Sequence, residues 1–440
     1  MVIESLKYKI LQQFGFAPTQ EQGQALDTFV SFLTDRDPQA VMILRGSAGT
    51  GKTSLSGAIV RTLLQIRQKV MLLAPTGRAA KVFSLGSGAP AYTIHRRIYR
   101  EKAFAGVDGQ FSLNDNLYTD TLFMVDEASM IANMGLGGTT FGSGCLLDDL
   151  VKFVYQGHND RLLLIGDKAQ LPPVGEEESP ALSASVMEGY GLKVYECDLN
   201  EVLRQSQSSG ILYNATLIRQ MITHDAVTGL PLIRFKGFAD IVMMPGAELV
   251  ESLGDSYHHV GMDETMVITR SNKRANIYNN GIRNMVLDRE EELSSGDMLM
   301  IVKNNYFWTE KEKKESGEGS AGAVPAFLAN GDRAKVLRVS NYIELYGFRF
   351  ATLLLQLPDY DDYEMQVTGM LDTLQSEAPA LTHEQQEELF RQVEEDYQHF
   401  VPLKADRMKS IRQDAYFNAL LIKYAYAVTC YKAQGGQWAD

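Results

Sequence analysis

The sequence has 440 residues, which is too long for one ordinary domain, so we expect two or three compact units. Hydrophobic residues make up 45% and charged residues 22% of the chain, and no apolar run is long enough to span a bilayer. This composition excludes disordered and membrane-spanning proteins. The three cysteines (Cys145, Cys197 and Cys430) are widely spaced, which argues against disulfides and structural zinc. With an N-terminus that lacks the features of a secretion signal, they favour the cytoplasm.

The net charge of −13 is concentrated in one block of the chain. Residues 351–400 contain twelve acidic residues and one basic residue, so the rest of the chain carries a net charge of only −2. The remainder can therefore present a local basic groove of the kind that contacts phosphates. We expect the acidic block to be largely helical. It is interpreted as a solvated face, or alternatively as a region that repels DNA or docks a partner.

The first half of the chain alternates short apolar runs with helical patterns. Apolar runs bounded by Gly, Pro or acidic residues predict buried strands of a parallel sheet. Strands are expected at 41–44, 70–74, 122–125 and 162–165, and helices at 53–67 and 143–156. Repeated strand–helix units predict a doubly wound α/β core that binds ligands at the carboxyl ends of its strands.

The second half contains another strand–helix unit, which begins at 266–269. Strand-like pieces at 296–304 and 330–339 flank a Gly-, Glu- and Lys-rich loop at 309–323. They predict a small β-barrel inserted into a second core. A further buried strand is expected at 424–429.

The expected domains follow from these patterns. They are a first core at 1–205, a second core at 206–296 and 416–440, and an inserted barrel with an acidic helical segment at 297–415.

A glycine-rich loop follows the expected strand 41–44 and precedes a helical pattern. Glycines let backbone N–H groups wrap phosphates, and a helix N-terminus favours an anion. Lys52 is predicted to reach the β- and γ-phosphates of ATP, and the Thr53 hydroxyl to ligate Mg²⁺. Alone, the motif does not separate a motor from a kinase or a GTPase. The nucleotide-binding residues of the loop are Gly46, Ala48, Gly49, Thr50, Gly51, Lys52 and Thr53.

Two further strands end in polar residues. After 122–125 come Asp126, which is predicted to hold Mg²⁺, and Glu127, which is predicted to polarise a water for attack on the γ-phosphate. A glutamate at this position favours hydrolysis over transfer to another substrate. After 162–165 come Asp167 and Gln170. Gln170 is placed to sense the γ-phosphate, and Asp167 to connect that signal to the rest of the core.

In this order, the three motifs resemble those of superfamily 1 helicases, most closely the RecD/Dda-like branch that moves 5′ to 3′ on single-stranded DNA. The resemblance runs from about residue 17 to the end of the chain. It implies an α/β fold with two RecA-like P-loop cores, each with a parallel sheet, and an SH3-like β-barrel inserted in the second core. It also implies a strand-separating β-hairpin between Tyr99 and Tyr118.

The resemblance extends to further site residues. Gln22, within 19–25, would recognise adenine; Arg204, within 199–205, would be the arginine finger on the γ-phosphate; and Gly435 would contact the nucleotide. The implied DNA contacts are Pro75, Thr76, Arg78, His95, Asn272, Thr429 and Lys432. Tyr431 stands where the family usually has His. Four rings could stack on bases, the alternative for each being ordinary packing: His95, Tyr99, Phe307 and Trp308.

The resemblance therefore implies an Mg-ATP-dependent DNA helicase or translocase that acts on single strands and on single/double-strand junctions. It implies DNA repair or recombination as the setting, with other proteins of those pathways as partners. The sequence ends at Asp440, before the family's terminal arginine motif, so we expect the chain to be incomplete. The alternative is an ATP- and DNA-binding scaffold subunit with weak or no motor activity. A P-loop kinase or GTPase would not explain residues 166–173 or the second core.

Overall fold

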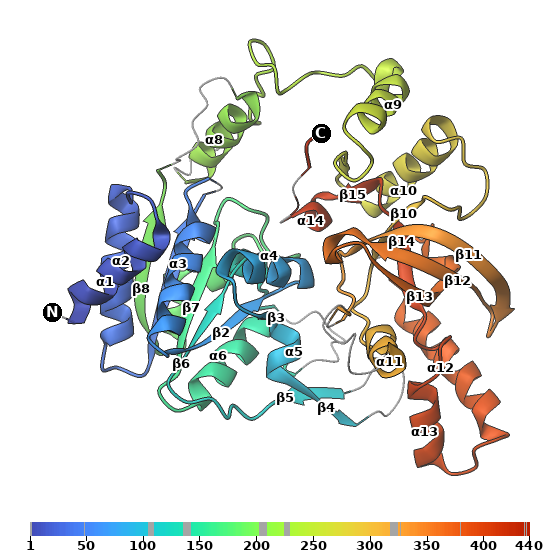
Figure 1. Ribbon diagram of the computed structural model, residues 1–440, viewed down its shortest axis with the longest axis horizontal. Coiled ribbons are helices and arrows are strands. Elements are labelled where there is room, and N and C mark those ends of the chain that lie inside the picture. Colours follow the sequence, from blue (N-terminus) through green and yellow to red (C-terminus); the bar gives the residue numbers. More distant parts are fainter. Residues whose placement is uncertain are drawn as a thin grey trace. The chain divides into compact units, whose positions relative to one another are not determined.

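The computed structural model describes residues 2–47, 49–103, 110–134, 142–201, 209–223, 229–316, 324–325, 327–378, 380–434, 436 and 438–440. The chain divides into two compact units (Figure 1). The first comprises Met1–Pro75, Ala79–Ala103 and Gln110–Met244, and the second contains Thr76–Arg78 and Pro245–Asp440. Among the described residues, no helix is both long and apolar enough to cross a bilayer.

The first unit is built on a six-stranded sheet in the order β3-β2-β6-β7-β1-β8, and every pairing within it is parallel. The four strands predicted from apolar runs are all present. This result confirms the parallel-sheet α/β core. The strands are β1 (Ala40–Gly46), β2 (Lys69–Ala74), β3 (Ala91–Thr93), β6 (Thr121–Val125), β7 (Arg161–Gly166) and β8 (Lys193–Leu199).

Helices cover both faces of this sheet (Figure 1). Because successive strand side chains point to opposite faces, Met42 and Leu44 pack with helices α1 to α3, while Val41 and Ile43 pack with α5 and α6. Burying both faces is what makes these strands read as continuous apolar runs. The helices of this half are α1 (Val2–Phe14), α2 (Gln20–Thr34), α3 (Lys52–Gln65), α4 (Gly77–Ser87), α5 (Ile94–Ile98), α6 (Leu146–Gln156), α7 (Ala184–Gly189) and α8 (Gly210–Thr223).

An antiparallel hairpin projects from the first unit at the expected place, formed by β4 (Tyr99–Ala103) and β5 (Gln110–Leu113). Its base is fixed by Tyr99, whose hydroxyl donates a hydrogen bond to Asp149 Oδ2 at 2.7 Å. Only 7% of Tyr99 is exposed. The suggestion that this ring stacks on a base is therefore wrong, because the ring is packed against the core and its hydroxyl is bonded to α6.

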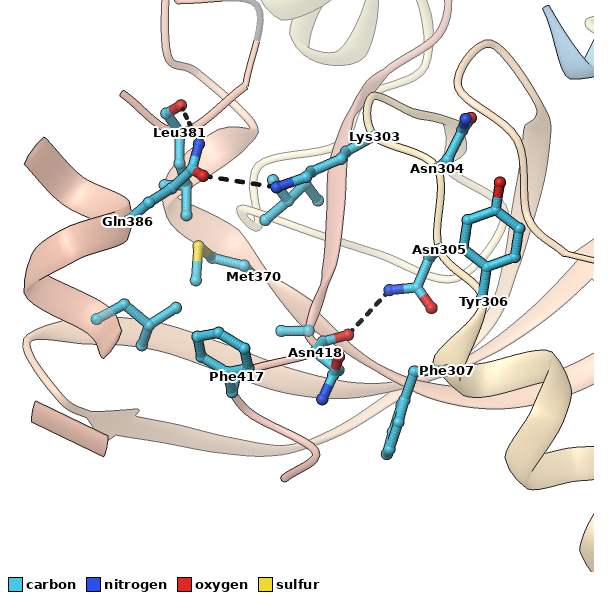
Figure 2. A pocket seen from close by; sticks show the side chains of 13 residues that line it. Lys303, Asn304, Asn305, Tyr306, Phe307, Met370, Leu381, Gln386, Phe417 and Asn418 are labelled. Carbon is cyan, nitrogen blue, oxygen red and sulfur yellow. Dashed lines mark hydrogen bonds between the residues drawn. The ribbon is translucent and has the colours of Figure 1, made fainter. Parts of the chain in front are cut away.

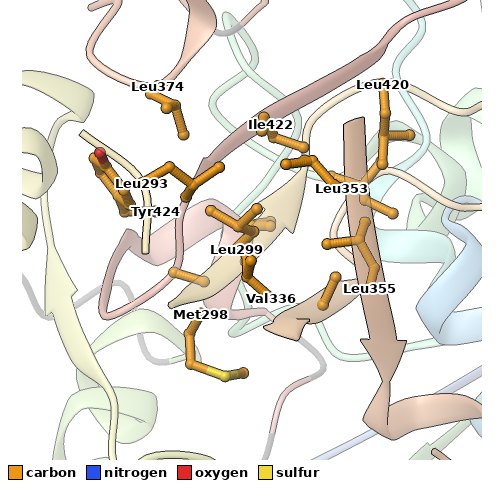
Figure 3. Packing of buried hydrophobic residues seen from close by; sticks show 14 of the residues in the cluster. Leu293, Met298, Leu299, Val336, Leu353, Leu355, Leu374, Leu420, Ile422 and Tyr424 are labelled. Atoms are coloured by element: carbon orange, nitrogen blue, oxygen red, sulfur yellow. The ribbon is translucent and has the colours of Figure 1, made fainter. Parts of the chain in front are cut away.

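A closed five-stranded barrel forms much of the second unit. Alternate side chains of its strands fill the interior, where Leu299, Val336, Leu353 and Ile422 pack together (Figure 3). The expected inserted barrel is confirmed. The strands are β10 (Met298–Ile301), β11 (Arg333–Leu345), β12 (Phe348–Leu357), β13 (Tyr363–Met370) and β14 (Leu420–Tyr424).

The acidic block is only partly helical, so that expectation needs correction. Strands β12 and β13 occupy its first part, and their turn carries acidic residues at 359, 361 and 362. The helical part is α12 (His383–Gln398), which α13 (Lys404–Arg412) follows. The charge count hid an apolar period of two at Leu353, Leu355 and Leu357, and this period is typical of a strand.

Two other expectations about the second unit are also corrected. Residues 309–316, expected in a loop, belong to helix α11 (Phe307–Ser316), where Lys311 and Glu315 lie one turn apart at 4.0 Å; residues 317–323 lie outside the described chain. The single strand expected at 424–429 is two strands. Strand β14 ends at Tyr424 and closes the barrel, although its segment was assigned to the second core.

The remaining elements of the second unit surround a short parallel pair. In that pair, β9 (Val267–Thr269) lies beside β15 (Ala427–Thr429). The helices are α9 (Leu249–His259), α10 (Asn272–Gly281), a π-helical turn at Ile282–Val286, and α14 (Cys430–Ala433).

A buried charge cluster joins the barrel to this pair of strands. The Asp297 carboxylate, 0% exposed, accepts hydrogen bonds from Arg283 at 3.0 Å, from Arg289 at 2.6 Å and from the Tyr426 hydroxyl at 2.8 Å. A buried carboxylate is tolerated when it is paired and fully hydrogen-bonded in this way. The cluster thus holds the start of β10 against the segment between β14 and β15.

Candidate functional site

The glycine-rich loop, below called the phosphate loop, connects β1 to α3, and its glycines determine its shape. Gly49 and Gly51 have φ values of +81° and +82°, which disfavour residues with a side chain. A Cβ on Gly46 would lie 2.9 Å from Leu199 Cβ, so a larger residue does not fit there. The backbone is therefore built to approach a ligand closely, as phosphate binding requires. Ala48, also predicted to bind nucleotide, lies outside the described residues.

Lys52 begins helix α3 and turns back over the loop. Its Nζ donates hydrogen bonds to the carbonyls of Gly46 at 2.5 Å and Ser47 at 2.8 Å. Burial lowers the pKa of Lys52, and nearby carboxylates partly oppose this effect. The neighbouring Thr53 is exposed. The ammonium group therefore lies where the loop would cradle a phosphate.

The acidic pair follows β6, beside β7 in the sheet. The Asp126 Oδ1 accepts the backbone N–H of Glu127 at 2.9 Å, and Glu127 has a φ of +51°, which turns the chain sharply after the strand. Burial raises the pKa of both carboxyl groups. For Glu127 the Asp126 charge adds to burial, and its pKa reaches about 7. A carboxylate with such a pKa is suited to accept a proton at neutral pH.

The loop that carries Asp167 and Gln170, here called the sensor loop, follows β7, which lies between β6 and β1 in the sheet. Gln170 hydrogen-bonds the Glu127 side chain, and its Oε1 accepts from the Ser129 hydroxyl at 3.2 Å. Asp167 accepts the N–H of Ala169 at 2.9 Å and acts electrostatically on Lys52. The ends of three neighbouring strands therefore bring Lys52, Asp126, Glu127, Asp167 and Gln170 together in one pocket.

Oxygen donors at this edge suit Mg²⁺, which is usually bound by one or two carboxylates together with substrate phosphates. Thr53 and Asp126 supply a hydroxyl and a carboxylate beside the phosphate loop. Within the described part of the chain, no group of three His, Cys, Asp or Glu side chains forms a metal site by itself. A metal at this site would therefore depend on the nucleotide for its remaining ligands.

Gln22 lies at the start of α2 and is buried, with 1% exposed. Its Oε1 accepts the N–H of Thr19 at 3.0 Å, completing a capping box, and its Nε2 donates to the Thr50 carbonyl at 2.9 Å. The residue thus ties α2 to the phosphate loop, and its contact with adenine stays a prediction. Arg204 and Gly435 lie outside the described residues.

Arg219 is a further residue of the pocket that the sequence motifs do not mark. This residue lies on α8, and its Nη2 is 3.8 Å from Asp167 Oδ2. It also acts electrostatically on Lys52. No motif marked this arginine, and only the pairing of α8 with the sensor loop reveals it.

The predicted DNA-binding residues fall into two groups. Pro75 and Thr76 follow β2, Arg78 lies on α4, and the half-buried His95 lies on α5, where burial lowers its pKa. The others lie together in one narrow notch of about 10 Å³, which Asn276, Asn279 and Lys423 also line. The residues in the notch that were predicted to bind DNA are Asn272, Thr429 and Lys432.

A larger cavity of about 240 Å³ lies in the second unit, beside β14 and α12 (Figure 2). Its amide groups are used within the fold: Asn305 Nδ2 donates to the Asn418 carbonyl at 3.0 Å, and Gln386 Nε2 to that of Leu381 at 2.9 Å. Phe307 lines the cavity, whereas Trp308 is 4% exposed with its Nε1 bonded to Asn418. Base stacking by Trp308 is therefore wrong, because packing covers the ring.

Comparison with known proteins agrees with this geometry. An AAA domain family model matches residues 17–229. The ATP-dependent RecD2 DNA helicase of Deinococcus radiodurans is 30% identical over 157 residues, which cover 36% of this chain and 18% of RecD2. The ATP-dependent DNA helicase Dda of Enterobacteria phage T4 is 25% identical over 267 residues, which cover 59% of this chain and 55% of Dda.

Over these segments the chain is similar to RecD/Dda-like helicases of superfamily 1. The aligned segments span less than two thirds of either curated relative. A crystal structure of Pif1 helicase from Bacteroides, in complex with ADP-AlF3 and single-stranded DNA, has 12% sequence identity and a TM-score of 0.44. That match covers 96% of this chain and 84% of the Pif1 chain.

Proposed function

We propose that this chain is a DNA-dependent ATPase that moves 5′ to 3′ on single-stranded DNA and separates strands at junctions. One observation carries the ATPase part: Lys52, the acidic pair Asp126–Glu127 and Gln170 meet at the carboxyl edge of one parallel sheet. Similarity to two proteins named as ATP-dependent DNA helicases supports the DNA part. The direction rests only on the resemblance of the sequence motifs to the RecD/Dda-like branch. We further propose that the protein acts in the cytoplasm and takes part in DNA repair or recombination.

Hydrolysis in this pocket needs a base, an oriented water and compensation of charge. Glu127 takes a proton from the water as its oxygen bonds to the γ-phosphorus, and the bond to the bridging oxygen breaks to leave ADP and phosphate. Gln170, hydrogen-bonded to Glu127, orients that water, and Lys52 offsets phosphate charge. Thr53 and Asp126 would hold Mg²⁺, whose charge would offset that of the phosphates.

Movement requires DNA contacts that change with the nucleotide. The first unit carries Pro75, His95 and the β4–β5 hairpin, and the second carries Asn272 and Lys432 in the notch. A motor of this class changes the relation of two cores when ATP binds and leaves. We assign strand separation to the hairpin.

A strand-displacement assay tests this function. With Mg-ATP, the chain should unwind a duplex that has a 5′ single-stranded tail and leave a 3′-tailed duplex intact. Unwinding of the 3′-tailed duplex alone would overturn the direction. Failure on both, with single-strand binding retained, would favour the alternative below.

The alternative is an ATP- and DNA-binding scaffold subunit without motor activity. A scaffold would bind nucleotide but show no stimulation of hydrolysis by DNA. The two functions therefore differ in one measurable rate.

A further inference from the structure

Arg219 is carried by a helix whose start is fixed in place. Asp240 caps α8: its carboxylate accepts the Ser209 hydroxyl at 2.6 Å and the Gly210 N–H at 2.7 Å. One turn along, Asn214 exchanges hydrogen bonds with the backbone of Arg234, at 2.9 Å and 2.8 Å. Residues 234–240 therefore fix the position of α8 and, with it, the backbone from which the Arg219 side chain extends.

The Arg219 side chain reaches the sensor loop. It is 17% exposed, and its Nη2 lies 3.8 Å from Asp167 Oδ2, which belongs to a side chain that is 9% exposed. A charge-assisted hydrogen bond between such groups is normally about 2.7–2.9 Å long. The distance to Asp167 is therefore longer than that of a direct hydrogen bond between these two groups.

The side chains around Lys52 indicate what the Arg219 charge could do. Three carboxylates, Asp126, Glu127 and Asp167, act on Lys52, and Arg219 acts on it with the opposite sign. A nucleoside triphosphate brings further negative charge to this edge of the sheet. A second cation there would reduce the repulsion, and the planar guanidinium matches phosphate oxygens in geometry.

We propose that Arg219 is a cation of the γ-phosphate end of the pocket, held by Asp167 when that phosphate is absent and donating to its oxygens when it is present. The inference rests on the proposed nucleotide site.

Comparison of two nucleotides tests the assignment without requiring turnover. Binding of Mg-ADP and of the non-hydrolysable triphosphate AMPPNP is measured by calorimetry for the wild type, Arg219→Ala and Arg219→Lys. Arg219→Ala should weaken AMPPNP binding about tenfold to a hundredfold, as loss of a charged hydrogen bond does, and change ADP binding less than about twofold. Arg219→Lys should recover part of the AMPPNP affinity because the charge is kept.

The matched control is Arg61→Ala. Arg61 is a half-buried arginine of α3 that donates to the Gly86 carbonyl at 3.1 Å, about 13 Å along the helix from Lys52. It should leave both affinities unchanged.

Equal losses for ADP and AMPPNP in Arg219→Ala would mean that the arginine only supports the fold and would overturn the proposal, as would unchanged AMPPNP affinity. If the wild type binds neither nucleotide, the proposed function itself fails. That result differs from one in which wild-type binding is intact and Arg219 is silent.

Discussion

Gln22 Nε2 donates a hydrogen bond to the backbone carbonyl of Thr50 at 2.9 Å, which joins the first turn of α2 to the phosphate loop. The same side chain caps its own helix through the Thr19 N–H. A residue expected to recognise a base therefore also holds the loop that would bind the phosphates.

Gln22→Ala should lower the stability of the first unit by about 1–2 kcal/mol, since it removes a helix cap and leaves the buried Thr50 carbonyl without this donor. Urea unfolding followed by circular dichroism measures the change. The control is Gln24→Ala, an exposed position of the same helix, which should change stability by less than about 0.5 kcal/mol. Equal effects of both substitutions would refute the linking role of Gln22.

Lys52→Ala and Glu127→Gln should fail in different ways. Without the Lys52 ammonium, turnover should fall below detection because phosphate charge is left uncompensated. Glu127→Gln keeps the shape of the pocket, so Mg-ATP binding should change little while kcat falls about 10²–10⁴-fold. Nucleotide binding and steady-state hydrolysis, measured on both variants, separate the roles. Equal loss of binding in the two would contradict the assignment.

Hydrolysis should depend on pH through Glu127. Burial and Asp126 raise its pKa to about 7, and the base must be unprotonated, so activity is present above this pH and lost below it. The kcat/KM for ATP should therefore fall about tenfold per pH unit below roughly pH 6.5 and level off above roughly pH 7.5. ADP affinity over the same range serves as the control. A kcat/KM profile that is flat throughout would rule out this base.

Asp297→Ala should destabilise the second unit strongly. It would leave the guanidinium groups of Arg283 and Arg289 without their buried carboxylate, at a cost of about 3–5 kcal/mol. Asp372→Ala is the comparison: Asp372 pairs with Arg349 near the surface and should cost about 0–1 kcal/mol. Thermal unfolding of both variants measures the difference. Similar losses would show that the Asp297 cluster contributes no more than a surface pair.

The sequence predicted those parts of the molecule whose local pattern reports their surroundings. Buried parallel strands are apolar on both faces, so β1, β2, β6 and β7 could be located from their continuous apolar runs. The glycines, Lys52 and the acids followed because each stands directly after such a strand. Their meeting in one pocket could be expected because the ends of parallel strands share an edge.

What the sequence did not reveal depends on long-range contacts. The acidic residues of their turn hide strands β12 and β13 in the sequence. Trp308 has the character of a stacking ring in the sequence, but the fold buries it. Arg219 carries no motif, because its position beside Asp167 arises only when α8 returns to the sheet. No periodicity in the sequence encodes that return.

The most direct test of the central claim is the rate of ATP hydrolysis by the purified chain, with Mg²⁺, in the presence and absence of single-stranded DNA. We predict a clear stimulation by DNA that Glu127→Gln abolishes. A rate that is the same with and without DNA, while nucleotide and DNA both bind, would contradict the account.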